Sequence, residues 1–279
     1  MVAILVALLS SVLGGGADFL GGYATKRVPV FLVAATSQAG AAAVLLALVL
    51  LLRPSTPSLG YMPWAIAAGL TLAAGLVAFY SALATGTMGI VAPITALGVV
   101  VPLTWGLATG DSPSSLQGAG IAVAVIGVVL ASGPEVHGVT GPRPILLACG
   151  AGLFFGASLT FLAEAATANV LPTLLTMKVA AALLLAAGVM WARSGPDAYR
   201  ARGAVPTFAL IALADVTAYL CLTFALSVGP ISVISVLGSL YPAVTVILAR
   251  IVLRERLGLV QVAGVAVVFV GVVLISAGR

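Results

Sequence analysis

The feature that most constrains this chain is a succession of apolar stretches, each about 20 residues long, joined by short polar connections. About 20 apolar residues are what an α-helix needs to cross the hydrocarbon core of a bilayer. Only 7% of the 279 residues are charged and 62% are hydrophobic, whereas soluble domains carry about a quarter charged residues. These charges are too few to cover a soluble surface, so the chain is predicted to be a multi-pass membrane protein.

Ten membrane-spanning helices are predicted. Helices are favoured over a β-barrel because the apolar runs are continuous, whereas barrel strands alternate apolar and polar residues. The first run has no basic residues before it and is long enough to span, so it is interpreted as a helix rather than a signal peptide. The expected spans are 2–23, 30–52, 62–84, 90–109, 116–132, 144–164, 170–192, 206–226, 230–249 and 258–277. The predicted fold class is therefore all-α, in the cell (inner) membrane.

The two halves of the chain repeat each other. An offset of 140 residues, which becomes 144 after residue 242, aligns Gly16-Ala17-Asp18 with Gly156-Ala157-Ser158, Gly98 with Gly238, Pro102 with Pro242, and Gln117-Gly118-Ala119-Gly120 with Gln261-Val262-Ala263-Gly264. Five helices per repeat is an odd number, so the second repeat enters the membrane in the opposite sense to the first. Such inverted repeats suit alternating access, because each half can gate one side. We expect repeats at 1–133 and 144–279, joined by a linker at 134–143.

Several motifs give the chain a resemblance to a known family. They are Gly14-Gly15-Gly16-Ala17-Asp18-Phe19 in the first span, Tyr241-Pro242 in the ninth, Arg254-Glu255-Arg256-Leu257 after it, and the glycine pattern from Gly264 to Gly271. In these the chain resembles the EamA family of the drug/metabolite transporter superfamily, over nearly its whole length. In the first repeat, Asp111 stands where the family usually has the glutamate of its Glu-Arg motif. The resemblance implies ten helices around a central cavity, lined mainly by spans 1, 3, 4, 6, 8 and 9.

Acidic residues inside the predicted spans are the first candidates for a binding site, because each intramembrane charge costs about 2.5–3.5 kcal/mol on insertion scales. Asp215 lies in the eighth span and Asp18 in the first, and both spans line the cavity in the resembling family. Such a carboxylate can hold a proton or a substrate cation, or it can be a structural acid bonded to Ser, Thr or a helix end. Lys178, in the seventh span, can be the ion-pair partner of one of these aspartates or can reach the membrane surface. We favour the second interpretation, because Lys178 lies within about two turns of the start of the span.

Polar and aromatic residues complete the candidate set for binding a substrate or a proton. Tyr219 follows Asp215 by one turn, on the same helix face. The remaining candidates are Tyr80, Thr95, Trp105, Ser158, Ser235, Ser239 and Tyr241. For most of the single serines we prefer a packing role between helices. No catalytic residue and no metal site is predicted, because one histidine (His137) and two cysteines cannot supply a usual zinc ligand set.

The predicted function is secondary transport of a small metabolite, an amino acid or a similar amphipathic compound, with export as the expected direction. No Walker motif is present, so no nucleotide or other cofactor is expected. The expected partners are the lipid bilayer, a small-molecule substrate and, as one alternative, a coupling proton. Nucleic acid is not expected, because the basic residues are scattered between apolar segments as membrane anchors are. A membrane-embedded lipid-modifying enzyme and a non-transporting scaffold are the alternatives, and the oligomeric state stays open.

The basic residues also bear on the orientation of the chain. With ten spans, nine of the 12 lie in loops on one side: Lys26, Arg27, Arg143, Arg193, Arg200, Arg202, Arg250, Arg254 and Arg256. Arg53 and Arg279 lie on the other side, together with both termini. The positive-inside rule therefore places the termini outside the cytoplasm, whereas the resemblance implies cytoplasmic termini.

Overall fold

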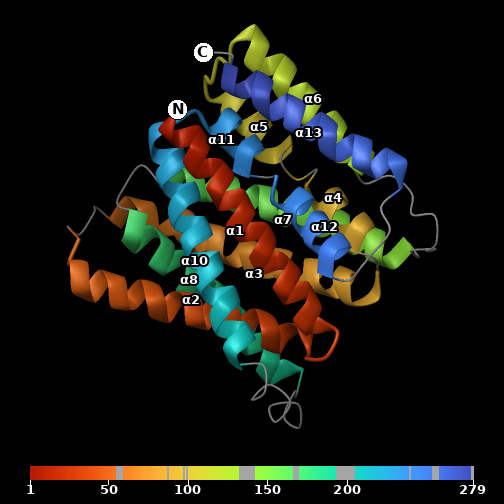
Figure 1. Ribbon diagram of the computed structural model, residues 1–279. Coiled ribbons are helices and arrows are strands. Elements are labelled where there is room, and N and C mark those ends of the chain that lie inside the picture. The colour runs from red at the N-terminus through yellow and green to blue at the C-terminus, as the bar shows by residue number, and fades with distance from the viewer. Residues whose placement is uncertain are drawn as a thin grey trace.

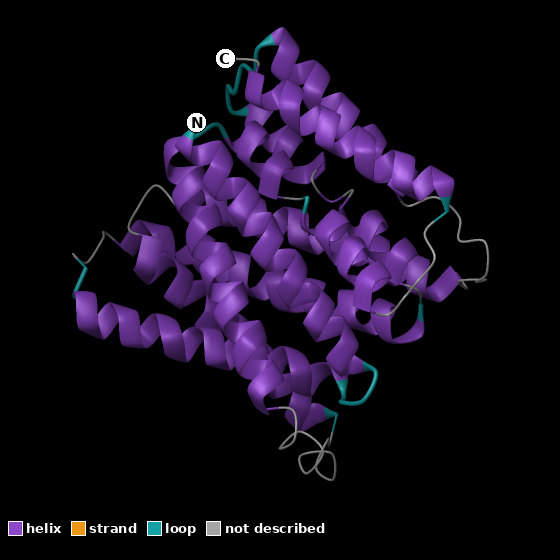
Figure 2. Ribbon diagram, in the orientation of Figure 1, coloured by secondary structure: helices purple, strands orange, loops and turns teal. Residues whose placement is uncertain are grey.

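The computed structural model describes residues 1–54, 59–86, 88–96, 98, 100–131, 142–165, 170–192, 205–238, 240–252 and 258–277. Throughout this part the regular structure is helical, with no strand (Figure 2). Helices follow from the composition of the segments, because in lipid every backbone N–H and C=O must find its partner within the segment itself.

Six of the described helices are long and apolar enough to cross a membrane. They are α1 (Val2–Thr25), α2 (Val30–Leu52), α3 (Met62–Thr85, preceded by the short 3₁₀ helix η1, Leu59–Tyr61), α7 (Pro142–Ala165), α8 (Val170–Trp191) and α10 (Val205–Val228). They coincide with the predicted spans 1, 2, 3, 6, 7 and 8 to within a few residues. The predicted all-α, multi-pass membrane protein is confirmed at this level.

Shorter helices occupy the other four predicted spans. They are α4 (Met88–Ala96) and α5 (Val100–Ala108) over the fourth span, α6 (Ser115–Ala131) over the fifth, α11 (Ile231–Gly238) and α12 (Tyr241–Val252) over the ninth, and α13 (Leu259–Ala277) over the tenth. The fourth and ninth spans are thus two helices each, rather than one continuous helix. Pro242 lies in the first turn of α12, where its missing N–H removes no helical hydrogen bond. Gly98 and Gly238 lie at corresponding places in these two spans.

Each helix in the first half of the chain packs mainly against a helix of the second half. The most extensive contacts pair α1 with α10, α3 with α7, α2 with α8, and α6 with α13 (Figure 1). This pattern of contacts is the same for both halves. The first helix of each half packs against the third helix of the other half. The second and fifth helices pair with their own counterparts.

The short helices α4 and α5 approach α7 closely because the contact is made by glycines. A Cβ atom at Gly98 would overlap the backbone of Gly152, and a Cβ at Gly156 would overlap the carbonyl oxygen of Gly98. On the other side of the molecule, a Cβ at Gly15 of α1 would overlap the carbonyl oxygen of Tyr241 in α12. Because these glycines have no side chains, α1 and α7 lie directly against the divided fourth and ninth spans.

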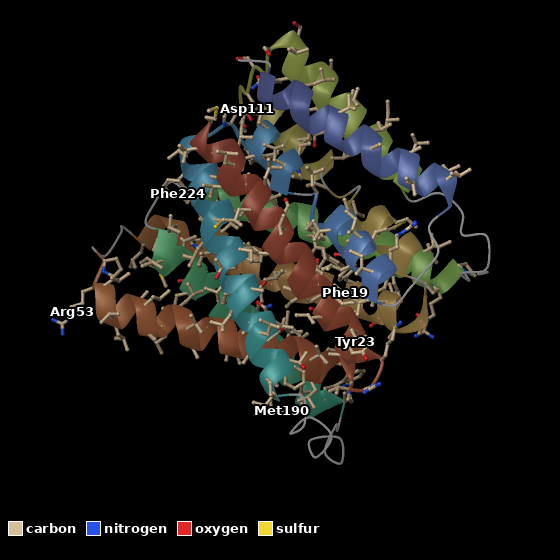
Figure 3. All side chains as sticks on the ribbon, in the orientation of Figure 1. Phe19, Tyr23, Arg53, Asp111, Met190 and Phe224 are labelled. Atoms are coloured by element: carbon tan, nitrogen blue, oxygen red, sulfur yellow. The ribbon has the colours of Figure 1, made fainter. Side chains whose placement is uncertain are left out.

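The ends of the helices lie toward two opposite edges of the molecule. In Figure 3, Arg53 lies at the left, Phe224 at the upper left and Asp111 at the top, whereas Tyr23 lies toward the lower right and Met190 at the bottom. The start of α1 and the end of α13 also lie toward the upper left (Figure 1). The chain passes from one edge to the other along successive helices.

Candidate functional site

A cavity of about 110 Å³ lies in the interior of the helical bundle. Its wall comes from α1, α3, α4, α7, α10, α11 and α12, together with Gly98. These helices occupy spans 1, 3, 4, 6, 8 and 9, which are the spans that the resemblance assigns to a central cavity. The lining residues are Ser10, Gly14, Ala17, Asp18, Leu72, Leu76, Thr95, Gly98, Gly152, Phe155, Gly156, Leu159, Asp215, Ala218, Tyr219, Leu222, Gly238 and Tyr241.

An ion pair joins the cavity wall to the helix behind it. The Nζ atom of Lys178, in α8, lies 2.6 Å from Oδ2 of Asp215, in α10. The Lys178 side chain is fully buried, whereas that of Asp215 is 14% exposed. The expectation that Lys178 reaches the membrane surface is therefore wrong. Its ammonium group stays inside because a carboxylate on the neighbouring helix offsets part of the cost of burying the charge.

Tyr219 forms the second contact of the buried ammonium group. The Nζ atom of Lys178 lies 3.8 Å from the centroid of the Tyr219 ring. An ammonium group over an aromatic face is attracted by the negative face of the ring, and the attraction is stronger where water is excluded. Asp215 and Tyr219 lie one turn apart on α10, so a single helix supplies both the carboxylate and the ring.

Asp18 is the second carboxylate of the cavity. It lines the wall from α1 and lies within electrostatic range of Asp215 and Lys178. Among the residues that the structure describes, no side chain forms a salt bridge or a hydrogen bond with it. The cavity therefore combines two carboxylates with one ammonium group, and only one carboxylate is directly paired.

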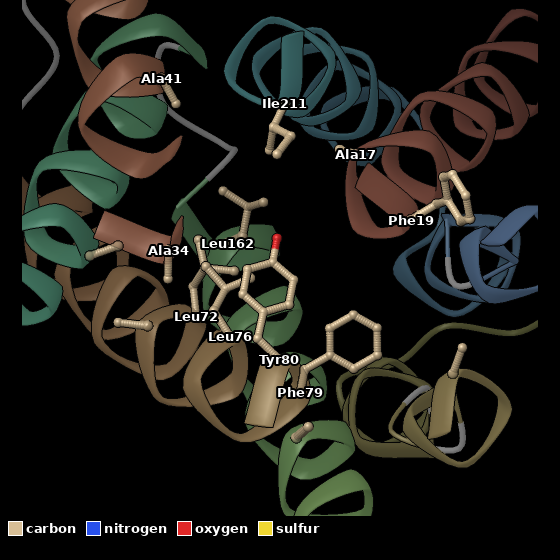
Figure 4. Packing of buried hydrophobic residues seen from close by; sticks show 14 of the residues in the cluster. Ala17, Phe19, Ala34, Ala41, Leu72, Leu76, Phe79, Tyr80, Leu162 and Ile211 are labelled. Atoms are coloured by element: carbon tan, nitrogen blue, oxygen red, sulfur yellow. The ribbon is translucent and has the colours of Figure 1, made fainter. Parts of the chain in front are cut away.

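Three more predicted site residues lie at or near the cavity. Thr95 and Tyr241 line it, and the Thr95 hydroxyl donates to the Val91 carbonyl oxygen at 2.9 Å. Tyr80 is buried in α3 beside α1, where a Cβ at Gly21 would overlap its hydroxyl oxygen. Figure 4 shows this hydroxyl pointing away from α3 toward α1 and α10. Tyr80 therefore belongs to the packing next to the cavity rather than to its lining.

Two further predicted site residues, Ser158 and Trp105, are not brought to the cavity lining. The Ser158 hydroxyl donates to the Ala68 carbonyl oxygen at 2.8 Å and so joins α7 to α3, which is the packing role preferred for single serines. Nε1 of Trp105 donates to Oε1 of Glu164 at 2.6 Å and joins α5 to α7. Ser235 lies in α11, but its side chain is outside the described part, and Ser239 lies outside the described residues altogether. The same is true of His137 and of Arg254-Glu255-Arg256-Leu257.

Sequence analysis missed two kinds of contributor to the site. It considered an ion pair between Lys178 and an aspartate but favoured a position at the membrane surface, although a lysine within an apolar helix was a visible signal. It also missed Phe155 and Leu222, for which the sequence carries no signal, because they are two among many apolar residues. Within the described part of the chain, no group of three His, Cys, Asp or Glu side chains is placed to hold a metal ion.

Comparison with known proteins agrees with the fold and the cavity. Residues 142–277 match the model of the EamA-like transporter family. No curated protein sequence matches the chain. Among solved structures 29 chains match. One crystal structure, 15% identical in sequence, superposes with a TM-score of 0.73 over 98% of this chain and 95% of its own, and at this identity it shows the fold alone. Residues 142–277, slightly less than half of the chain, therefore match the EamA-like transporter family, in agreement with the family resemblance predicted from the sequence.

Proposed function

We propose that the protein is a secondary transporter that exports a small amphipathic metabolite, such as an amino acid, across the cell (inner) membrane. The observation that carries this proposal is the cavity with Asp18, Asp215 and Tyr219 on one part of its wall and apolar side chains on the rest. Small-molecule sites combine a largely apolar wall with a few polar groups that fix orientation. Here the polar groups suit an amine and the apolar wall suits the body of the molecule.

Alternating access between two inverted five-helix repeats is the proposed mechanism. Three observations support it: the sequence repeat, the pairing of helices that survives exchange of the two halves, and the alternation of helix ends between two edges of the molecule. In this proposal α4 with α5, and α11 with α12, each form one crossing, which gives ten. The repeats are residues 1–133 and 144–279, and the cavity lies where they meet.

Asp215 is proposed as the main polar element of the transport site, with Tyr219 beside it and Asp18 as the second acid. The repeat offset places Gly75 opposite Asp215 in the first half, and the Phe155 ring packs where a Cβ of Gly75 would lie. A purely architectural role shared by both halves therefore does not account for Asp215. The carboxylate either exchanges a coupling proton or holds the amine of the substrate.

Transport by Asp215→Asn in proteoliposomes tests this proposal. Asparagine has nearly the same shape without a titratable group. If Asp215 couples protons, the variant loses the pH dependence of transport. If it holds an amine, the variant binds substrate more weakly while any separate pH dependence survives. Thr217→Val on the lipid-facing side of α10 is the matched control, because the Thr217 hydroxyl bonds only within its own helix.

A wild-type rate, affinity and pH profile in Asp215→Asn would contradict both versions. The Asp18→Asn variant is measured in parallel, because Asp18 has no described ion-pair partner whose charge would be stranded. Circular dichroism and size-exclusion chromatography establish that each variant is folded before transport is compared.

A further inference from the structure

We infer that Lys178 determines the charge of the ligand that the cavity accepts, and that this ligand is an organic amine with a single positive charge. The inference rests on the proposed function and narrows its substrate to amines without a free carboxylate, because the zwitterion of an amino acid has no net charge. Lys178 does not line the cavity, so it acts on the ligand through the charge that it contributes to the site.

The first step of the argument is the balance of charge. Asp18 and Asp215 line the cavity, and Lys178 is the one cationic side chain that the described structure places against either of them. With Asp18 protonated the site is neutral, and with all three groups ionised it has one uncompensated negative charge. The rest of the wall is largely apolar, including Leu72, Leu76 and Phe155. An uncompensated charge in apolar surroundings is costly, and a ligand with one positive charge removes that cost.

The second step is the geometry of the existing ion pair. The Lys178 ammonium group lies 2.6 Å from the carboxylate of Asp215 and 3.8 Å from the centroid of the Tyr219 ring. A carboxylate beside an aromatic face is a usual way for proteins to bind an organic ammonium group. Lys178 contacts Asp215 and Tyr219 from α8, whereas Asp215 and Tyr219 also line the cavity. A ligand amine therefore meets the same chemistry from the open side, between Asp215 and Asp18.

The third step is the comparison with the other half of the chain. The repeat offset pairs Lys178 with Gln38, which is also buried, in α2. The Oε1 atom of Gln38 has no hydrogen-bond partner among the described residues. The fold therefore accepts an uncharged polar side chain at this position of the repeat. A charge at this position is therefore not part of the architecture that the two halves share, and the balance of charge in the cavity accounts for it.

The experiment compares two probes of the same length and different charge. n-Butylamine carries one positive charge and 1,4-diaminobutane carries two. Binding to the purified protein in nanodiscs is measured by isothermal titration calorimetry, in a buffer that keeps the amines protonated. We expect the wild type to prefer n-butylamine and Lys178→Met to prefer 1,4-diaminobutane, with a change in the affinity ratio of about tenfold or more, which is about 1.4 kcal/mol.

The decisive comparison is between Asp215→Asn and Asp215→Asn/Lys178→Met. The single variant has no net charge in the site and should lose n-butylamine binding. The double variant restores one negative charge, on Asp18, and should recover it. Asp18→Asn and Asp18→Asn/Lys178→Met repeat the comparison with Asp215 as the remaining acid. A lysine that serves only to hold α8 against α10 would predict no recovery in either double variant.

Gln38→Met is the matched control, because it removes a buried polar group at the corresponding position without changing the charge, and the preference should stay that of the wild type. The inference is overturned if the wild type binds both amines equally or neither, or if the double variants do not recover binding. The proposed function fails separately, if neither amino acids nor amines are exchanged across proteoliposomes.

Discussion

The Lys178–Asp215 ion pair places a fully buried ammonium group beside a carboxylate that is mostly buried. Coulombic attraction between the partners offsets the cost of removing both from water, but little net stability remains once that cost is subtracted. Removing one partner is a different matter, because the other charge is then left inside without compensation. The pair is therefore a strong constraint on single substitutions and a weak one on paired substitutions.

Lys178→Met should accordingly destabilise the folded protein by about 3–5 kcal/mol, the range for breaking a buried pair from one side. Lys178→Met/Asp215→Asn should cost less than the single variant, because no charge is stranded. Thermal unfolding in detergent, followed by circular dichroism, measures both. A double variant that unfolds at a lower temperature than the single variant would contradict this account of the pair.

At this scale the sequence predicted which acids line the cavity better than it predicted their partners. Asp18, Asp215, Tyr219, Thr95 and Tyr241 line one cavity because intramembrane polar residues must face the bundle interior, a rule that can be applied to a sequence. Whether Lys178 is buried or exposed depends on how α8 is rotated against α10, and its partner Asp215 lies 37 residues further along the chain. Hydropathy fixes the position of a residue along a helix and leaves this rotation undetermined.

Among the elements, α7 has the closest neighbours. Its glycines lie against the backbone of the segment that joins α4 to α5, without intervening side chains. Gly98, Gly152 and Gly156 all line the cavity, so this part of its wall is formed by backbone without side chains. The spacing between α7 and this segment is set by the absence of three Cβ atoms.

Gly156→Ala should destabilise the protein by about 1–3 kcal/mol, the usual cost of overpacking, because its Cβ would overlap the Gly98 carbonyl oxygen and the Val101 side chain. The matched control is Gly16→Ala at the corresponding position of the first repeat, where a Cβ meets nothing within 4 Å. We expect Gly16→Ala to leave stability unchanged or slightly raised, because alanine favours the helix. Equal melting temperatures for the two variants would refute this.

Element boundaries followed from the sequence wherever one apolar run makes one helix. The six long helices were predicted to within a few residues, because length and hydropathy alone determine them. The division of the fourth and ninth spans was not predicted as two helices each. Pro93, Pro102 and Pro242 lie within the apolar runs of these spans, where a proline permits a kink. Their positions do not predict the helix ends, since α4 ends at Ala96 and α12 begins at Tyr241.

For the whole molecule, the open question at the sequence level was which side the termini face. The two edges seen in Figure 3 separate Tyr23 and Met190 from Arg53 and Asp111. Tyr23 is close in sequence to Lys26 and Arg27, and Met190 is close to Arg193, so the edge with Tyr23 and Met190 is the richer in basic residues. By the positive-inside rule we expect this edge to be cytoplasmic and the termini to lie on the opposite side.

Reporter fusions at Arg279 measure this orientation directly. The charge distribution predicts alkaline phosphatase activity, which requires export of the fused domain, and no fluorescence from a fused green fluorescent protein. As a control, the same reporters inserted after Arg27 should give the reverse result. Fluorescence at Arg279 without phosphatase activity would show that the resemblance to related transporters, and not the charge rule, gives the orientation.

The pairing of helices across the two halves has a consequence for biosynthesis. When α1 leaves the ribosome, the helix against which it packs most extensively, α10, has not been made. Roughly 200 residues separate the ends of these two helices, so at about 5–20 residues per second the delay is on the order of 10–40 s. During this time Asp18 is in the translocon or the lipid without its final neighbours. The assembled bundle can therefore close only once translation is nearly complete.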